Sequence, residues 1–462
     1  MTERLVIAAL LVALCAATLY CVRRRSPLEP SVLLVATTVL VGTFYPIGAA
    51  LVPPLTWRHG AYLPQEVVLD AQWQYLAFAL GACAIVARVR WRRTESAEPP
   101  RAYRTEDDPA RSFRDLVIAG GLVIGGGLLY AIYIKKVGLA PLMDRSNFAE
   151  KYRVSSGLGT FYIGLNLVIA GCLWAEASTL SRGLTRAFRA IALGVMIWSI
   201  GIVAVRTYAV ALFLGYVYLA CRDRGFSLAR VRPWVVIALG VGYAGIESYA
   251  MLRGAWKGSL MDAMRTVQQQ QKGIEQTLGQ IVGGSELSHP FLTAMELAQF
   301  EEAGSLRGSS YANAALGVLP LWLYPDRPPT PAQEFAREHY PSFEARGGGT
   351  AFSVVGEAWW NFGSLVGPFG VGLALAYLLS SLERRSRTCP WSAVARFQPY
   401  LVHMIVLAHR GSSVSIAKHL FSVLLPVMLL ATCAGVIWRA LGARAEQAER
   451  SLNTLSPVEG GA

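Results

Sequence analysis

The stretch Leu5–Cys21 reads LVIAALLVALCAATLYC and is followed almost at once by Arg23-Arg24-Arg25. A helix of about 17 apolar residues, rising ~1.5 Å per residue, approaches the thickness of the bilayer's hydrocarbon core. Its alanine-rich end resembles the end of a signal peptide, but arginines directly after it are the wrong flank for cleavage and translocation. The stretch therefore predicts a retained membrane helix whose C-terminal end faces the cytoplasm.

Similar apolar runs recur along the chain. Of its 462 residues 53% are hydrophobic and only 16% are charged, whereas soluble domains carry roughly 25% charged residues. The sequence therefore predicts an all-α polytopic membrane protein with about 11 transmembrane helices. After the first run, the predicted helices are 31–52, 70–88, 115–134, 158–177, 189–204, 207–221, 233–251, 355–380, 393–409 and 419–438.

The distribution of charge predicts the orientation. Alternating sides from the first helix assigns nearly all of the net charge of +13 to the cytoplasmic segments, as the positive-inside rule requires. This places the N-terminus in the periplasm and the C-terminus in the cytoplasm, and it argues against a nucleic-acid partner. Residues 189–221 are the sensitive point, because a single helix there would reverse every later segment.

This topology divides the chain into four parts. Residues 1–251 hold helices one to eight, 252–354 form a large periplasmic loop, 355–438 hold helices nine to eleven, and 439–462 form a cytoplasmic tail. Within the loop, 258–281 is predicted to be helical, 289–323 to be helix plus re-entrant or interfacial backbone, and 330–345 to be a short helix opened by Thr330 as N-cap and by Pro331.

The seven cysteines all lie outside the large loop. A periplasmic loop without cysteine has no disulfide framework, even though it faces an oxidising space. The cysteines are interpreted as small buried hydrophobic residues.

Ionisable residues next to the apolar runs are the candidate site residues, because a charge at membrane depth is costly unless it is used. On the predicted outer side these are Arg206, Glu247, Arg253, Glu357, His403, His409 and Arg410. Each has a structural alternative: arginines at helix ends extend to lipid headgroups, Glu247 can pair with an arginine, and His403 can pack between helices.

The chemistry of these residues suits a lipid-linked diphosphate. Guanidinium groups bind phosphate through paired hydrogen bonds and can stabilise the charge on a departing diphosphate. A carboxylate or imidazole can take the proton of an attacking hydroxyl. The sequence has no P-loop, no dinucleotide-binding glycine pattern, no HExxH and no paired CxxC, so an ATP-driven pump and a zinc protease are both disfavoured, and no cofactor or metal is expected.

Two segments suggest a family. The turn Tyr324-Pro325-Asp326-Arg327 leads towards Gly356-Glu357-Ala358-Trp359-Trp360-Asn361-Phe362-Gly363, and Arg206-Thr207 opens a helix before the long loop. In these features, over about residues 115–438, the chain resembles the bacterial oligosaccharide repeat-unit polymerases, the O-antigen polymerases of the Wzy type. The tryptophan pair departs from the more usual aliphatic residue or alanine followed by tyrosine.

The resemblance implies a helical fold like that of class-C membrane glycosyltransferases. It also implies an enzyme of the bacterial inner membrane that joins undecaprenyl-diphosphate-linked repeat units at the periplasmic face, with no metal or nucleotide sugar at that step. A chain-length regulator and a flippase are the implied protein partners.

For this chemistry the sequence assigns the following roles. Arg206, Arg253 and Arg410 bind the diphosphate, while Arg327, Arg337 and Arg346 guide anionic substrate in the loop. Glu357 acts as acid/base or orients the acceptor, with His409 as the second candidate.

Other functions stay open. A ligase that moves finished glycan to another acceptor would use the same chemistry. A transporter or lipid-linked glycan flippase would show matching halves with broken helices, and a structural or sensor subunit would need no clustered outer arginines. The glycines 363, 367 and 370 are expected to allow close helix approach.

Overall fold

The computed structural model describes residues 2–22, 28–51, 65–91, 109–143, 161, 163–178, 180–202, 206–223, 261–262, 265, 288–319, 323–345, 350–389 and 392–455. Regular structure in these ranges is helical, with no strand. The predicted helices at 233–251 and 258–281 lie outside this part of the chain, except for residues 261, 262 and 265 of the second.

One half of the bundle contains the helices α1 (Thr2–Cys21), α2 (Pro30–Leu51), α3 (Gln65–Trp91) and α19 (Val366–Thr388). Here α3 and α19 approach so closely that a Cβ on Gly372 would lie 2.3 Å from the Phe78 carbonyl oxygen, and one on Gly81 would lie 2.1 Å from that of Phe369. Of the glycines expected to allow close approach, Gly367 does so against α18 (Val354–Phe362), where its Cβ would lie 2.9 Å from the Ala358 carbonyl oxygen, whereas a Cβ on Gly370 would meet nothing within 4 Å.

The other half contains α4 (Pro109–Val137), the short α5 (Leu139–Met143), α8 (Gly164–Glu176), α9 (Arg182–Ile197), the π-helical turn η1 (Trp198–Ile202) and α10 (Arg206–Asp223). A Cβ on Gly126 would lie 2.5 Å from the Gly164 carbonyl oxygen, so α4 and α8 pack backbone against backbone. In the described parts of this stretch, α9 and α10 are separate helices that contact each other, as expected.

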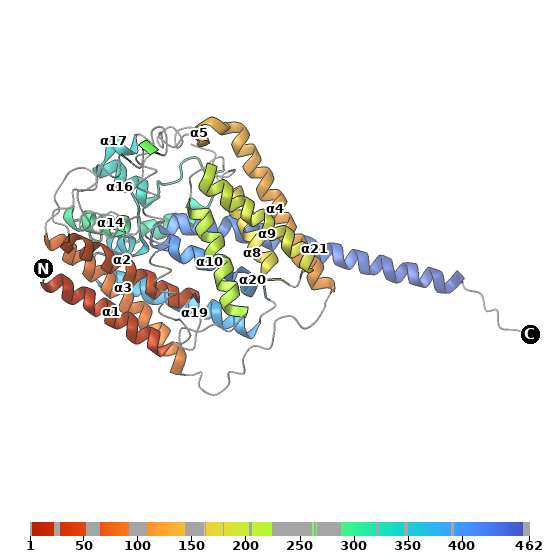
Figure 1. Ribbon diagram of the computed structural model, residues 1–462, viewed down its shortest axis with the longest axis horizontal. Coiled ribbons are helices and arrows are strands. Elements are labelled where there is room, and N and C mark those ends of the chain that lie inside the picture. Colours follow the sequence, from red (N-terminus) through yellow and green to blue (C-terminus); the bar gives the residue numbers. More distant parts are fainter. Residues whose placement is uncertain are drawn as a thin grey trace, which may run out of the picture.

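The helix α20 (Ala393–Ala408) contacts helices of both halves, whereas α21 (Ser413–Leu455) packs on α4, α8 and α20. Figure 1 shows the helices of the large loop gathered at one end of the bundle, while the C-terminal part of α21 projects beyond the other end.

The large loop contributes α14 (Ser288–Gln299), α15 (Ser309–Gly317), α16 (Pro331–His339) and α17 (Pro341–Glu344), and α18 (Val354–Phe362) follows it. The predicted start of α16 is confirmed: the Thr330 hydroxyl accepts from the Gln333 backbone N–H at 3.3 Å, and the Gln333 side chain accepts from the Thr330 N–H at 3.2 Å. This reciprocal pair is a capping box.

The continuous helix expected over 355–380 is wrong. The chain turns at Gly363, whose φ of +72° ends α18, and α19 begins only at Val366. A left-handed φ costs glycine little, and its N–H closes the helix on the Trp359 carbonyl at 2.8 Å. The turn separates a short polar-faced helix from the apolar helix that follows.

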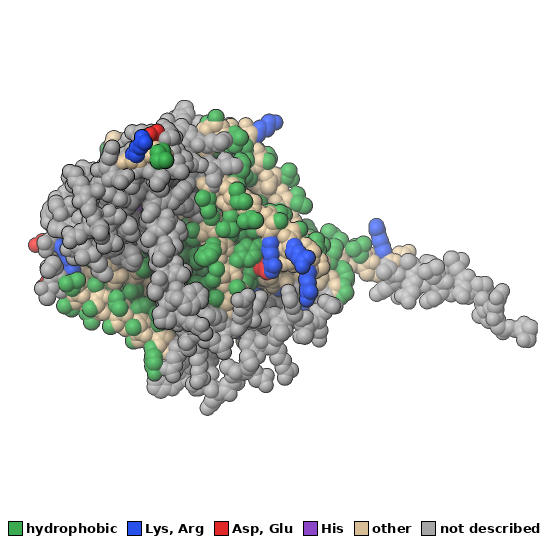
Figure 2. All heavy atoms as spheres, in the orientation of Figure 1, with side chains coloured by type: hydrophobic (Ala, Val, Ile, Leu, Met, Phe, Trp, Pro, Cys, Tyr) green, Lys and Arg blue, Asp and Glu red, His purple; other side chains and the backbone are tan. Residues whose placement is uncertain are grey.

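The bundle has the surface of a membrane protein. Five helices are long and apolar enough to cross a bilayer: Glu3–Cys21, Pro109–Val137, Arg182–Ile200, Val366–Thr388 and Ser413–Arg444. Figure 2 shows hydrophobic side chains over much of the described surface, with few charges among them. Water would not stabilise so much exposed apolar surface on a monomer, so the chain is a membrane-embedded, all-α protein. All seven cysteines are free.

Buried ion pairs and hydrogen bonds join the helices at the end remote from the loop. Arg396 donates to Asp115 at 2.9 Å, and the Trp174 indole donates to the same carboxylate at 3.2 Å. Glu383 accepts from the Ser31 backbone at 2.6 Å. Because each of these buried charges has a hydrogen-bond or ion-pair partner, its burial has a structural explanation.

Candidate functional site

Glu357 is the candidate that the fold buries most completely, with no exposed surface. Ser353 caps α18 by accepting from the Gly356 N–H at 3.1 Å, and its hydroxyl lies 3.1 Å from that of Tyr75 on α3. The cap sets the start of the helix, so that Glu357 falls one turn later on its buried face. The N-cap at Ser353, which can be read from the local sequence, therefore directs the Glu357 side chain into the bundle.

The Glu357 carboxylate is held by three short hydrogen bonds. Oε1 accepts from the hydroxyls of Ser310 and Ser413 at 2.6 Å each, and Oε2 accepts from the Ser413 backbone N–H at 2.6 Å. Ser413 is the first residue of α21, where free N–H groups and the helix dipole favour a negative charge. Glu357 therefore joins α15, α18 and α21 in one contact.

Asn361 completes this network from the next turn of α18. Its amide donates to the Ser310 hydroxyl and to the Glu357 carbonyl, both at 2.7 Å. Burial raises the pKa of the Glu357 carboxyl, and the bonds from Ser310 and Ser413 act in the opposite direction. We call Ser310, Glu357, Asn361 and Ser413 the carboxylate network.

His409 and Arg410 lie in the turn of residues 409–412, which joins α20 to α21 directly before Ser413. The His409 Nε2 is 3.2 Å from the Thr38 hydroxyl on α2, and its ring packs edge-on against Phe78 with centroids 6.1 Å apart. Its buried Nδ1 has no hydrogen-bond partner among the described residues. The Arg410 side chain is exposed. The fold thus brings His409 and Arg410 to the carboxylate network, although more than 50 residues separate them from Glu357.

This region is recessed in the bundle. Thr38 and Phe78 each lie about 13 residues from the loop-side ends of α2 and α3, which is roughly 20 Å at 1.5 Å per residue. We expected His409 and Arg410 at the outer membrane interface, whereas the turn that carries them ends a short helix inside the bundle. Hydropathy could not show this, because it measures the length of a helix and not its depth.

Loop helices fill the space above that turn. Phe291 of α14 lies against Tyr45 and Tyr75 with ring centroids 5.5 and 5.4 Å apart. Val354 and Val355 of α18 belong to the same buried apolar cluster as these rings. The large loop is therefore inserted between α2, α3 and α20 and does not only cover them.

Of the remaining predicted arginines, the structure describes the side chains of Arg327 and Arg337 only, and both have partners outside the carboxylate network. Arg206 opens α10 as expected, but its side chain lies outside the described atoms, as do Arg253, Arg346 and Glu247. Arg337 is exposed and pairs with Glu344 at 3.6 Å. Arg327 is half-buried and donates to the Leu319 carbonyl at 3.2 Å. The roles assigned to these residues stay predictions.

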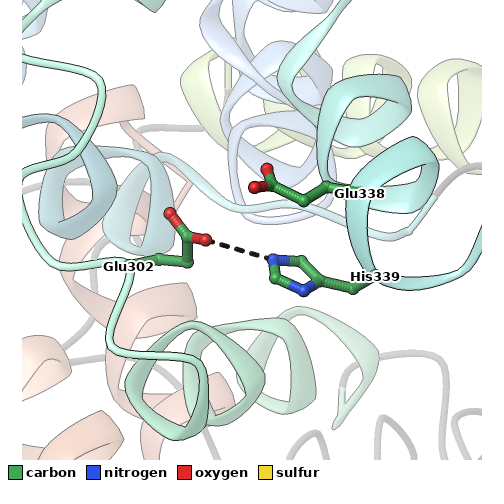
Figure 3. A group of neighbouring side chains, drawn as sticks. All are labelled: Glu302, Glu338 and His339. Carbon is green, nitrogen blue, oxygen red and sulfur yellow. Dashed lines mark ion pairs between the residues drawn. The ribbon is translucent and has the colours of Figure 1, made fainter.

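A second polar group lies in the loop, where Glu302, Glu338 and His339 place ligand atoms within 4.8 Å of one another (Figure 3). The His339 Nε2 faces a Glu302 oxygen at 3.3 Å, and Ser305 and the Trp360 indole donate to the other oxygen at 2.8 and 3.1 Å. Through these contacts Glu302 joins α16, α18 and the turn that follows α14, which gives its carboxylate a structural role.

Sequence reasoning missed the partners of Glu357 and also missed Lys418. Serines carry no signal of their own in an apolar context, so Ser310 and Ser413 could not be found without the fold. Lys418 did carry a signal, since it is a lysine directly before an apolar run and has no acidic neighbour in the sequence.

The fold and the site define an all-helical membrane protein with a carboxylate-centred polar network recessed in its bundle. No protein-family model, no curated protein and no solved structure matches the chain.

Proposed function

We propose that the protein is a membrane glycosyltransferase that polymerises lipid-diphosphate-linked oligosaccharide repeat units. The observation that supports this most is the convergence of Glu357, His409 and Arg410 on one recessed turn, beside helices with lipid-compatible surfaces. A lipid-linked substrate needs such a position, because its tail stays in the bilayer while its diphosphate and sugars require polar contacts.

In the proposed reaction a hydroxyl of the acceptor unit attacks the anomeric carbon of the donor. The bond from that carbon to the diphosphate oxygen breaks, and the lipid diphosphate leaves with the electron pair. A base takes the hydroxyl proton, and cations stabilise the charge on the leaving group. No redox cofactor enters this balance.

The contacts of Glu357 and His409 favour different parts in that reaction. Both oxygens of Glu357 already accept hydrogen bonds, so we assign it the orienting role, holding the turn of residues 409–412 through Ser413. His409 has an unpartnered ring nitrogen, and we assign it the role of proton acceptor. The enzyme would act at the periplasmic face of the bacterial inner membrane, with its N-terminus in the periplasm.

The test is reconstitution of the full chain in proteoliposomes with an undecaprenyl-diphosphate-linked repeat unit. We expect a ladder of longer lipid-linked glycans, at least ~100-fold weaker for His409→Ala, which removes the general base. Thr38→Val removes only the hydroxyl next to Nε2 and is the matched variant, expected to keep most activity. An unchanged ladder with His409→Ala would disprove the role of His409.

The same assay separates the alternatives. Transfer of a finished glycan to a second acceptor without lengthening indicates a ligase. Movement of the lipid-linked unit across the membrane with no new glycosidic bond indicates a transporter or flippase. Either outcome overturns the proposed polymerase.

A further inference from the structure

Arg327 and Lys418 come together at the contact between the large loop and α21. The end of α15 packs on the first turn of α21, where a Cβ on Gly317 would lie 2.6 Å from Val414. Arg327 donates to the carbonyl of Leu319, two residues beyond Gly317. Lys418 follows Val414 by four residues and so shares its face of α21. These contacts place both cations where the end of α15 packs on the start of α21.

Neither cation has a carboxylate partner in the part of the chain that the structure describes. The described ion pairs of other arginines involve Glu176, Glu344, Glu29 and Asp115. Two half-buried positive charges in such an arrangement are unfavourable unless an anion joins them.

Polar groups continue from Lys418 into the bundle. The neighbouring His419 ring lies 3.0 Å from the Asn166 amide of α8. His403 of α20 is a second buried imidazole on a helix that contacts α21. It is 2% exposed, and neither of its ring nitrogens has a partner among the described residues. The cations therefore stand at the edge of an interior that carries unused hydrogen-bonding groups.

We propose that Arg327 and Lys418 form a binding site for a phosphate or diphosphate group. The guanidinium can bind two oxygens in a fixed fork, and the ammonium supplies a compact charge and three donors. Arg327 reaches the site from the loop and Lys418 from α21, so the anion would join the two elements. That the anion is the diphosphate of a lipid-linked sugar rests on the proposed function, whereas the binding of phosphate does not.

The site differs from the one expected from the sequence. Arg410 was assigned to the diphosphate, but its side chain is exposed and lies in the turn before α21. Lys418 lies five residues after Ser413, which is about 7.5 Å along α21 at 1.5 Å per residue. A diphosphate held by Lys418 would therefore lie deeper along α21 than one held by Arg410.

The experiment measures binding to the full chain in phosphatidylcholine nanodiscs by isothermal titration calorimetry. The two probes are inorganic pyrophosphate in solution and farnesyl diphosphate in the bilayer. Lys418→Gln and Arg327→Gln remove one charge each, and Arg189→Gln is the matched control because that arginine is exposed and pairs with Glu176. We expect each of the first two variants to weaken pyrophosphate binding at least ~10-fold, as for a lost charged hydrogen bond.

Binding by the wild type should also weaken as salt is raised, since an accessible anion site is screened. Lys418→Arg keeps the charge and should keep binding within a few fold, so it tests the site even where the glutamine variant does not fold. Unchanged affinity in both glutamine variants, or equal losses in the control, would overturn the site.

The two probes separate the sources of the phosphate group. Binding of farnesyl diphosphate that requires Lys418 supports a lipid-borne diphosphate, and binding of pyrophosphate alone overturns that part. Failure of the proposed function is distinguishable, because binding would then persist in a protein that forms no glycosidic bond.

Discussion

At the scale of single residues, Glu357 illustrates how far the sequence could go. Its inward position follows from the Ser353 cap, which is readable from the sequence. Its partners are not readable, because Ser310 and Ser413 lie 47 and 56 positions away in the sequence. Helix propensity and hydropathy depend on residues that are adjacent in the sequence, whereas this contact depends on the tertiary packing of three helices.

The carboxylate network predicts a stability effect. Glu357→Ala leaves the Ser413 N–H, the half-buried Ser413 hydroxyl and the buried Ser310 hydroxyl without their acceptor, at about 1–3 kcal/mol for an unsatisfied buried group. We therefore expect the free energy of unfolding to fall by about 2–4 kcal/mol, and by less for Glu357→Gln, which keeps one acceptor oxygen. Equilibrium unfolding of the detergent-solubilised protein measures both.

Glu344→Ala is the control for this measurement. Glu344 is a carboxylate in the same loop region, but it is partly exposed and pairs with Arg337 at 3.6 Å. Such a pair contributes about 0–1 kcal/mol. If Glu357→Ala were no more destabilising than Glu344→Ala, the carboxylate network would not stabilise the packing of α15, α18 and α21.

At the scale of elements, the sequence predicted most of the helices that the structure describes, and it failed where packing decides. The run 355–380 has the length and apolarity of a single helix, yet it divides at Gly363 because the Gly304 backbone occupies the space beside it, 3.0 Å from where its Cβ would be. Of the glycines expected at helix contacts, Gly367 does lie at one, because its Cβ would be 2.9 Å from the Ala358 carbonyl oxygen of α18. Gly370 does not, and the contact of α3 with α19 uses Gly81 and Gly372. Spacing along one helix cannot identify the face that a partner will take.

These glycines give a paired prediction. Gly372→Ala places a methyl group 2.3 Å from the Phe78 carbonyl oxygen, so α3 and α19 must separate. Overpacking of this kind costs about 1–3 kcal/mol, and we expect a matching loss in the free energy of unfolding. Gly370→Ala adds the same methyl group where no atom lies within 4 Å, and it should be neutral or stabilise α19 by up to about 1 kcal/mol.

Equal effects of the two alanine substitutions would contradict the close contact. The comparison is controlled, because both residues lie in α19, only two positions apart, and carry the same change.

At the scale of the whole molecule, the arrangement of α20, α21 and the loop helices explains why the site is recessed. α20 spans only 16 residues, about 24 Å at 1.5 Å per residue, so its end falls short of the ends of α2 and α3. The helices α14 and α18 occupy the space that this leaves. A loop inserted in this way gives polar groups a position inside the bundle without placing charged residues on the lipid-facing surface.

The orientation of this arrangement is the last prediction. Net positive charge on the predicted cytoplasmic segments requires the N-terminus and the large loop to share one side, with the C-terminal tail on the other. Figure 1 shows the loop helices and the C-terminal end of α21 at opposite ends of the molecule, as this requires.

In a variant without the seven native cysteines, single cysteines at Thr2, Ser305 and Glu459 probe the three positions with a membrane-impermeant maleimide on intact spheroplasts. We expect labelling at Thr2→Cys and Ser305→Cys, and labelling at Glu459→Cys only after the membrane is opened. Labelling of Ser305→Cys only after opening would reverse the topology and move the proposed site to the cytoplasmic face, where periplasmic polymerisation could not occur.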